Sequence, residues 1–216
     1  MRYPTVALMT IILASGTIVA NGLRGAGPEP ETNDRATDRE ALAEGTISII
    51  SSFPPDGYID PRDPGGGQGM DEITLTFDGG TSGLTTLDFS ITVTDGTAPT
   101  IVGLAPSGND ITLSLDGPIP SWAWTTFTHN ASGTSTRIGF LPGDCNGSGR
   151  TNGIDALRFF DGVFGCWDPP FPELPLEFFL DINGSGTINP LDFTRWRQGV
   201  LGLIGPRPWY DETLPE

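Results

Sequence analysis

The chain has 216 residues, of which 30 are Gly, 20 are Pro and only 18% are charged. Acidic residues outnumber basic ones by 27 to 11, and the resulting formal net charge of −16 disfavours nucleic acid and anionic membrane surfaces as partners. The single His, His129, excludes zinc sites built on several histidines, and the abundance of Gly and Pro predicts short strands and turns rather than long helices.

The first 20 residues have the features of a secretory signal peptide. A short basic start, Met1-Arg2, is followed by an uncharged apolar stretch and by a small residue at Ala20, where we expect cleavage. An uncleaved membrane anchor is the alternative, because the uncharged stretch approaches the length needed to span a bilayer. No second apolar run of this length follows, so we expect a secreted or cell-surface protein with no other membrane segment. Residues 21–44 are polar and mixed in charge, which predicts a flexible linker.

Residues 45–142 have the pattern of a β-rich domain. Apolar residues such as Ile73, Leu75 and Phe77 alternate with polar ones, and Gly, Asp and Pro interrupt each run. About seven short strands in this pattern predict an antiparallel sandwich without helices of ordinary length. The expected strands cover 46–51, 73–77, 87–93, 99–104, 111–115, 121–128 and 135–140. The segments SSFPPDGYIDPRDP, DEITLTFDG and NDITLSLDGPIPSWAWTTFTH resemble bacterial Ig-like modules, and this resemblance implies a fold but no activity.

Two features of this region leave other functions open. Trp122 and Trp124 are two residues apart on one expected strand and share a face, so they either fill the core or form a platform for sugar rings. Carboxylates in and near the Gly-rich loop could flank a glycosidic bond, although Asp in such loops more often forms turns. These carboxylates are Asp56, Asp60, Asp63, Asp71 and Glu72. His129 has no obvious nucleophile beside it, so we interpret it as a turn residue and predict no catalytic residue and no enzyme.

The strongest signal is an internal repeat in the last third of the chain. Residues 144–165 (DCNGSGRTNGIDALRFFDGVFG) and 181–202 (DINGSGTINPLDFTRWRQGVLG) are identical at eleven of 22 positions, at a constant offset of 37. Each copy begins with a loop rich in Asp, Asn and Gly and continues into an apolar stripe that ends at a Gly. This order predicts a loop followed by a short helix. A pair of turns that bind no metal is the alternative, and it leaves the repetition in register unexplained.

The spacing within each copy is that of a calcium-binding loop, in which 12 residues supply oxygen ligands from positions 1, 3, 5, 7, 9 and 12. Gly149 and Gly186 fall at position 6, where the sharp turn needs a residue without a side chain. We therefore predict two bound calcium ions. The expected ligands are Asp144, Asn146, Ser148, the Arg150 carbonyl, Asn152 (directly or through water) and Asp155 in the first loop, and Asp181, Asn183, Ser185, the Thr187 carbonyl, Asn189 and Asp192 in the second.

Residues 143–204 resemble a dockerin of type I, a module with tandem EF-hand-type calcium loops. No apolar helix precedes Asp144, and Asp155 and Asp192 stand where EF-hand loops carry Glu, as in dockerins. The resemblance implies a small α-helical module that folds on calcium and attaches its protein to a cohesin module on a scaffold, often for polysaccharide degradation. Residues 205–216 follow as a tail.

The resemblance has two departures. Ser148 and Ser185 replace the family's usual Asp at position 5, so we expect weak binding of calcium, with dissociation constants of ~10⁻⁵–10⁻³ M. The family's partner-recognition pair at positions 10 and 11 is usually polar, whereas here it is Gly153-Ile154 and Pro190-Leu191. The expected protein partner is therefore a cohesin-like module, another module or the chain's own sandwich, and polysaccharide remains a further candidate.

The two cysteines give conflicting indications. An exported chain with an even number of cysteines favours a disulfide between Cys145 and Cys166. However, about ten helical residues between them would span ~15 Å, and bridged Cα atoms lie within ~7 Å. The pairing stays open at this point.

The sequence thus predicts a mostly β protein, an Ig-like sandwich followed by a small α-helical dockerin-like module. The leading hypothesis for function is a secreted, non-catalytic protein that attaches through its calcium-loaded module. The alternatives are a carbohydrate-binding sandwich that carries a dockerin, and a small glycoside hydrolase. Removal of calcium is expected to unfold residues 143–204 and to leave the sandwich intact.

Overall fold

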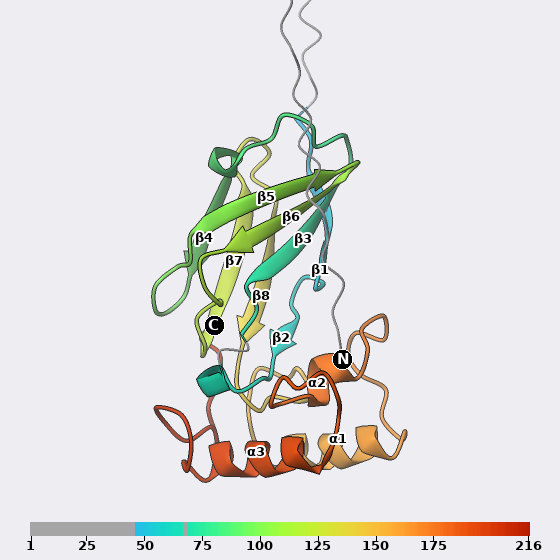
Figure 1. Ribbon diagram of the computed structural model, residues 1–216, viewed down its shortest axis with the longest axis vertical. Helices are drawn as coiled ribbons and strands as arrows, with labels where there is room; N and C mark the ends of the chain where they lie inside the picture. Colours follow the sequence, from blue (N-terminus) through green and yellow to red (C-terminus); the bar gives the residue numbers. More distant parts are fainter. Residues whose placement is uncertain (1–45, 67–68) are drawn as a thin grey trace, which may run out of the picture. The chain divides into compact units, whose positions relative to one another are not determined.

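The computed structural model describes residues 46–66 and 69–216. The predicted signal peptide (1–20) and linker (21–44) lie outside the described residues. Within the described ranges, no helix is both long enough and apolar enough to cross a membrane. Strands β1–β8 form two four-stranded sheets (Figure 1).

The first sheet is antiparallel throughout. Its strand order is β1-β3-β6-β5, so β1 and β5 are its edges. Both edge strands contain a shift of register, β1 between Ile49 and Ser51 and β5 between Ile101 and Gly103. The strands are β1 (Ile49–Phe53), β3 (Glu72–Phe77), β6 (Asp110–Leu115) and β5 (Ile101–Ser107).

The second sheet has the order β2-β8-β7-β4 and contains one parallel pair, between β2 and β8. Its strands are β2 (Ile59–Asp60), β8 (Ser135–Phe140), β7 (Ala123–His129) and β4 (Phe89–Val93). The predicted mostly β, sandwich-like class is confirmed. Among the described residues between 46 and 142, the only helical segments are two 3-10 turns, Pro64–Gly66 and Thr86–Asp88. Strand β2 was not predicted, because two residues are too few to show alternation.

The alternation in the sequence matches the two faces of the strands. In β3, Ile73, Leu75 and Phe77 are at most 1% exposed, and the intervening threonines are half-buried on the outer face. Leu113 and Ile111 of β6 lie opposite Ile73 and Leu75 and are fully buried. Each such side chain stabilises the fold by about 1.5–3 kcal/mol through removal of apolar area from water.

Trp122 and Trp124, at the start of β7, are not arranged as predicted. Strand β7 begins at Ala123, and Trp122 precedes it with a left-handed φ of 61°, so the two tryptophans are not on one face of one strand. Trp122 is 8% exposed and lies under the guanidinium of Arg207, with 4.3 Å between guanidinium carbon and ring centroid. Trp124 is half-buried on the outer face of the sheet, with Arg137 at 4.4 Å. Each ring is covered by an arginine, so neither offers an open platform.

Three helices follow the sandwich: α1 (Gly153–Val163), α2 (Glu177–Leu180) and α3 (Pro190–Val200). Helices α1 and α3 start at position 10 of the repeated loops, and the glycines expected to end them, Gly165 and Gly202, have φ values of 69° and 67°. Pro190 is the first residue of α3, where its missing N–H costs nothing. Helix α2 was not predicted, because it has four residues and follows a Pro-rich connection without helical periodicity.

The hydrophobic core continues from the sandwich into the C-terminal part. Tyr58 is 1% exposed, packs edge-on against Phe171, Phe178 and Phe179, and donates its hydroxyl to the carbonyl of Phe178 at 2.6 Å. The tail beyond residue 204 takes part as well, because Trp209 is fully buried.

Candidate metal centres

The first repeated loop folds around the side chain of Asp144. Its Oδ1 accepts the backbone N–H of Ser148 at 3.0 Å, and its Oδ2 accepts that of Gly149 at 2.7 Å. Gly149 has a φ of 80°, the left-handed conformation that position 6 of such a loop requires. Asp155 closes the loop from helix α1, because its Oδ1 accepts the N–H of Asn146 at 3.2 Å. The first and last predicted ligands are therefore held against the same turn.

The second loop reproduces this arrangement bond for bond. Asp181 Oδ1 accepts the N–H of Ser185 at 2.9 Å, Asp181 Oδ2 accepts that of Gly186 at 2.6 Å, and Gly186 again has a φ of 80°. Asp192 Oδ1 accepts the N–H of Asn183 at 3.1 Å. The identity of the two sequences at these positions thus corresponds to an identity of backbone geometry.

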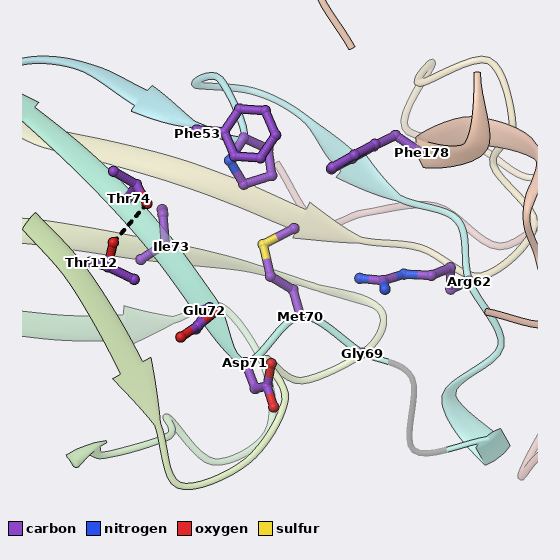
Figure 2. Close-up of a pocket in the computed structure, with 11 residues that line it drawn as sticks. Phe53, Arg62, Gly69, Met70, Asp71, Glu72, Ile73, Thr74, Thr112 and Phe178 are labelled. Carbon is purple, nitrogen blue, oxygen red and sulfur yellow. Dashed lines mark hydrogen bonds between the residues drawn. The ribbon is translucent and has the colours of Figure 1, made fainter. Parts of the chain in front are cut away.

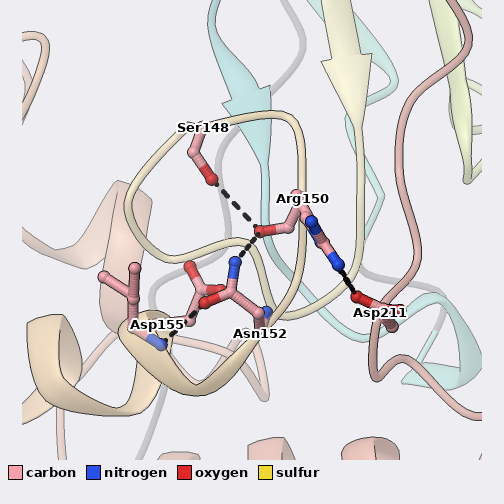
Figure 3. Close-up of polar contacts among 6 residues, drawn as sticks. Ser148, Arg150, Asn152, Asp155 and Asp211 are labelled. Carbon is pink, nitrogen blue, oxygen red and sulfur yellow. Dashed lines mark hydrogen bonds and ion pairs between the residues drawn. The ribbon is translucent and has the colours of Figure 1, made fainter.

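The hydroxyls at position 5 point to the carbonyls at position 7. Ser148 donates to the Arg150 carbonyl at 3.1 Å (Figure 3), and Ser185 donates to the Thr187 carbonyl at 3.1 Å. Two predicted ligand types, a hydroxyl and a backbone carbonyl, therefore meet in each loop.

The residues at position 9 serve as helix caps. The side-chain oxygen of Asn152 accepts the N–H of Ile154 at 2.8 Å, and that of Asn189 accepts the N–H of Leu191 at 2.9 Å. Asp155 Oδ2 accepts the N–H of Asn152 at 2.7 Å, which completes a capping box at the start of α1. With their side-chain oxygens directed to the helix, Asn152 and Asn189 would contact a cation only indirectly, as position 9 often does through water.

The carboxylates of the first loop are buried close to one another. Asp144 and Asp155 are both 0% exposed. Burial raises the pKa of Asp144 to about 6, and burial together with the charge of Asp144 raises the pKa of Asp155 to about 7. Among the described residues, no arginine forms an ion pair with either carboxylate. Two buried acids without a cationic partner are the electrostatic environment in which a bound cation is stabilising.

The donor set fits a hard cation. In the part of the chain that the structure describes, no group of three or more His, Cys, Asp or Glu residues could hold a metal. Each loop instead brings two carboxylates together with amide, hydroxyl and carbonyl oxygens, which is the ligand chemistry of calcium and not that of zinc. In the second loop, burial raises the pKa of Asp192, as it does for its counterpart Asp155.

The carboxylates of the glycosidase hypothesis are mostly occupied by structural bonds. Asp60 and Asp63 are buried and pair with Arg62 and Arg195. Asp56 accepts the backbone N–H of Arg137 at 2.7 Å. Asp60 and Asp63 are thus buried in ion pairs, whereas Asp56 is exposed at the surface.

The remaining two acids line a pocket of about 380 Å³ (Figure 2). Asp71 and Glu72 lie on one wall, and Phe53, which is 51% exposed, packs edge-on with Phe178 at 5.5 Å on another. The guanidinium of Arg62 also lines the pocket, and its Nε and Nη2 are bound by Asp60. The pocket combines aromatic rings with hydrogen-bond donors and acceptors.

His129 does have a hydroxyl partner. Its Nδ1 lies 2.8 Å from Ser132 Oγ, which in turn lies 2.7 Å from Thr134 Oγ1. The imidazole is 2% exposed and packs against the rings of Phe77 and Phe89. This network fixes the turn after β7, of which His129 is the last residue.

The cysteines are not bridged. Cys145 is buried and Cys166 is exposed, and both are free thiols. Burial, together with the nearby carboxylates Asp155 and Asp144, raises the pKa of the Cys145 thiol well above its usual value.

Asp211 is a site residue that sequence reasoning missed. It lies in the tail, yet its carboxylate pairs with Arg150 of the first loop (Figure 3). One residue of the tail, Trp209, could have indicated that the tail packs against the rest of the protein, because a tryptophan in a short polar segment is usually largely buried.

Comparisons with known proteins assign no family. No family model and no curated protein matches the chain. Solved structures that match include an L,D-transpeptidase from Mycobacterium smegmatis, at 14% identity and a TM-score of 0.32, covering 44% of this chain and 40% of that one. CopC from Methylosinus trichosporium OB3b matches at 14% identity and a TM-score of 0.28, covering 44% of this chain and 95% of that one. The chain thus spans less than half of the transpeptidase, and likeness at this level does not identify a relative.

Proposed function

We propose that this protein is a secreted or surface-held, non-catalytic attachment protein whose two repeated loops each bind one calcium ion. The observation that carries the proposal is the pair of loops with the same bonding pattern, each closing around two buried aspartates that form no ion pair among the described residues. Calcium would be held by the oxygens of positions 1, 3, 5, 7 and 12 and would neutralise the buried carboxylates.

Attachment would use the outer face of helix α1. Exposed apolar side chains lie on it, since Ile154 and Leu157 of α1 and Phe164 at its C-cap have 52%, 62% and 76% of their surface accessible. Exposed apolar side chains on a helix that is proposed to fold with calcium are suited to a protein partner. The resemblance of 143–204 to a dockerin makes a cohesin-like module the proposed partner, and the acidic charge of this chain favours a basic rim on that module.

The first experiment is a calorimetric calcium titration of residues 21–216. We expect two sites, and Asp144→Ala or Asp181→Ala should each remove one of them. Asp161→Ala is the matched control, because Asp161 is acidic, lies on α1 and pairs only with the exposed Arg158. Absence of binding at millimolar calcium would reject the proposal.

The second experiment tests attachment. Leu157→Asp should abolish binding to a panel of cohesin-like modules without changing the calcium titration. Leu87→Asp is the control, because Leu87 is 86% exposed and lies in the turn before β4. Equal binding by both variants would show that α1 is not the docking face.

A second candidate function is saccharide binding at the pocket of Figure 2. The exposed ring of Phe53 could stack on the apolar face of a sugar, and Glu72 and Arg62 could accept and donate hydrogen bonds. Titration with neutral oligosaccharides tests this candidate. Phe53→Ala should weaken binding, and Ile50→Ala, at a 63% exposed position of the same strand outside this pocket, should not.

A further inference from the structure

The C-terminal segment Trp209–Leu214, here called the C-terminal clasp, is bonded to the first calcium loop. The N–H of Thr151 donates to the Glu212 carbonyl at 3.0 Å, and the N–H of Asp211 donates to the Thr151 carbonyl at 2.8 Å. The N–H of Leu214 donates to the Gly149 carbonyl at 3.0 Å. These bonds form an isolated antiparallel bridge at Arg150, which is position 7 of the loop.

Side chains add to this backbone contact. Arg150 Nε donates to Asp211 Oδ1 at 2.9 Å, and Arg150 Nη2 forms a second bond to the same oxygen (Figure 3). The clasp itself is anchored at both ends. Trp209 is fully buried and its backbone N–H donates to the Gly199 carbonyl at 3.0 Å, and Leu214 is 9% exposed and packs over Gly139 of β8.

The second loop has no such support. Gly186, Thr187 and Ile188 are the counterparts of Gly149, Arg150 and Thr151 at the offset of 37. Among the residues that the structure describes, no segment forms a bridge with these three, and the bonds to the Thr187 carbonyl come from Ser185 and Asn189 within the loop. Two loops with nearly the same ligands therefore differ in what holds position 7.

We infer that the C-terminal clasp makes the two calcium sites unequal by preorganising the first loop, with Asp211 as a positioning residue. The Arg150 carbonyl is a predicted ligand, and the bonds on both sides of it fix its direction before calcium arrives. A loop that is already ordered loses less conformational entropy on binding, so its affinity is higher. The inference rests on the proposed calcium binding and adds a role for a segment outside the repeat.

The test isolates each loop in residues 21–216. Asp181→Asn leaves only the first loop intact, and Asp144→Asn leaves only the second. We expect the Asp181→Asn protein to bind calcium about five- to tenfold more tightly than the Asp144→Asn protein, from the saving in ordering entropy. Asp211→Asn is then added to each background, since Asn accepts the left-handed φ of 64° at this position and removes only the charge.

Asp211→Asn should weaken calcium binding about two- to fivefold in the protein with the first loop and leave the protein with the second loop unchanged, as expected for an exposed ion pair. Leu214→Pro, which removes the N–H donated to Gly149, should weaken the first loop further. Asp161→Asn is the control for an exposed ion pair in the same part of the chain. Equal affinities for the two loops, or an equal effect of Asp211→Asn on both, overturns the inference while calcium binding stands. Absence of any binding by the unmodified protein overturns the proposed function with it.

Discussion

Arg195 on helix α3 donates from Nε to the buried carboxylate of Asp63 at 2.5 Å, across 132 residues of sequence. Its counterpart in the first repeat, Arg158, pairs with Asp161 at the surface of α1. The same residue of the repeat thus joins the sandwich to the C-terminal part in one copy and remains in solvent in the other.

Arg195→Ala should destabilise the protein by about 2–4 kcal/mol, because Asp63 would be left buried without its partner. Arg158→Ala is a control within the same molecule and should cost less than about 0.5 kcal/mol, since both members of its pair are about two-fifths exposed. Urea unfolding monitored by circular dichroism measures both. Equal losses would show that the Asp63 contact contributes nothing beyond a surface pair.

Calcium removal should lower the stability of the whole region 46–216 in one transition. The core shared by Tyr58, Phe178 and Phe179 and the contacts of the clasp join the sandwich to the loops. This expectation replaces the one drawn from sequence, in which the sandwich stayed intact. Calorimetric melts with calcium and with excess chelator provide the measurement, and two separate transitions in chelator would restore the earlier expectation.

The calcium-free protein should become less stable as the pH rises from about 4 to 7. The folded-state pKa values of Asp144 and Asp155, about 6 and about 7, lie above the unfolded value of about 3.9, so the folded state holds more protons in this window. The protonated acids contribute stability at low pH that is lost as they ionise. With saturating calcium this loss should disappear, because the ion neutralises the carboxylates. Melting temperatures between pH 4.5 and 7.5, with Asp144→Asn as control, measure the effect, and a rise of stability with pH in chelator would contradict it.

Gly199→Ala should destabilise the fold by at least about 2 kcal/mol. A Cβ at this position would lie 2.1 Å from the nearest ring atom of Trp209, and the fully buried indole cannot move aside freely. Gly153→Ala, at the start of α1 with no atom within 4 Å of the added carbon, should be neutral or stabilise slightly. Thermal unfolding compares the two variants. If Gly199→Ala leaves the melting temperature unchanged, the C-terminal clasp is only loosely packed against α3.

A maleimide reagent should label Cys166 within minutes and Cys145 only after unfolding. Cys166 is exposed, whereas Cys145 is 0% exposed and its thiol pKa is raised by burial. Mass spectrometry after labelling with and without denaturant counts the modified thiols. Failure of both to react in denaturant without reductant would reveal a disulfide that the folded structure does not contain.

The strands could be predicted from sequence because their alternation is local, and the repeat could be recognised because its two copies align at a constant offset. Alternation in β3 and β6 follows from one face packing in the core, and the loop helices follow from the apolar stripes that end at Gly165 and Gly202. Trp122 was assigned to a strand because no local pattern marks a left-handed residue.

The contacts between distant segments were not accessible. The pairing of Asp63 with Arg195 and of Asp211 with Arg150 joins residues 132 and 61 positions apart, and each member looks like an ordinary surface charge in its own segment. The position-9 asparagines were expected as ligands, because the sequence cannot distinguish a side chain that faces the ion from one that caps the helix.

Comparison of the two repeats separates the residues that maintain the loop geometry from the exposed residues that vary. The side chains that form the shared loop bonds, those of Asp, Ser and Asn, are the same in both copies, whereas exposed helix residues differ, with Leu157 and Phe160 in α1 at the positions of Thr194 and Arg197 in α3. For the proposed attachment through α1, exchanging a few surface side chains between the helices would change the partner without altering the loop geometry proposed to hold calcium. The second copy supplies the sequence from which such an exchange would start.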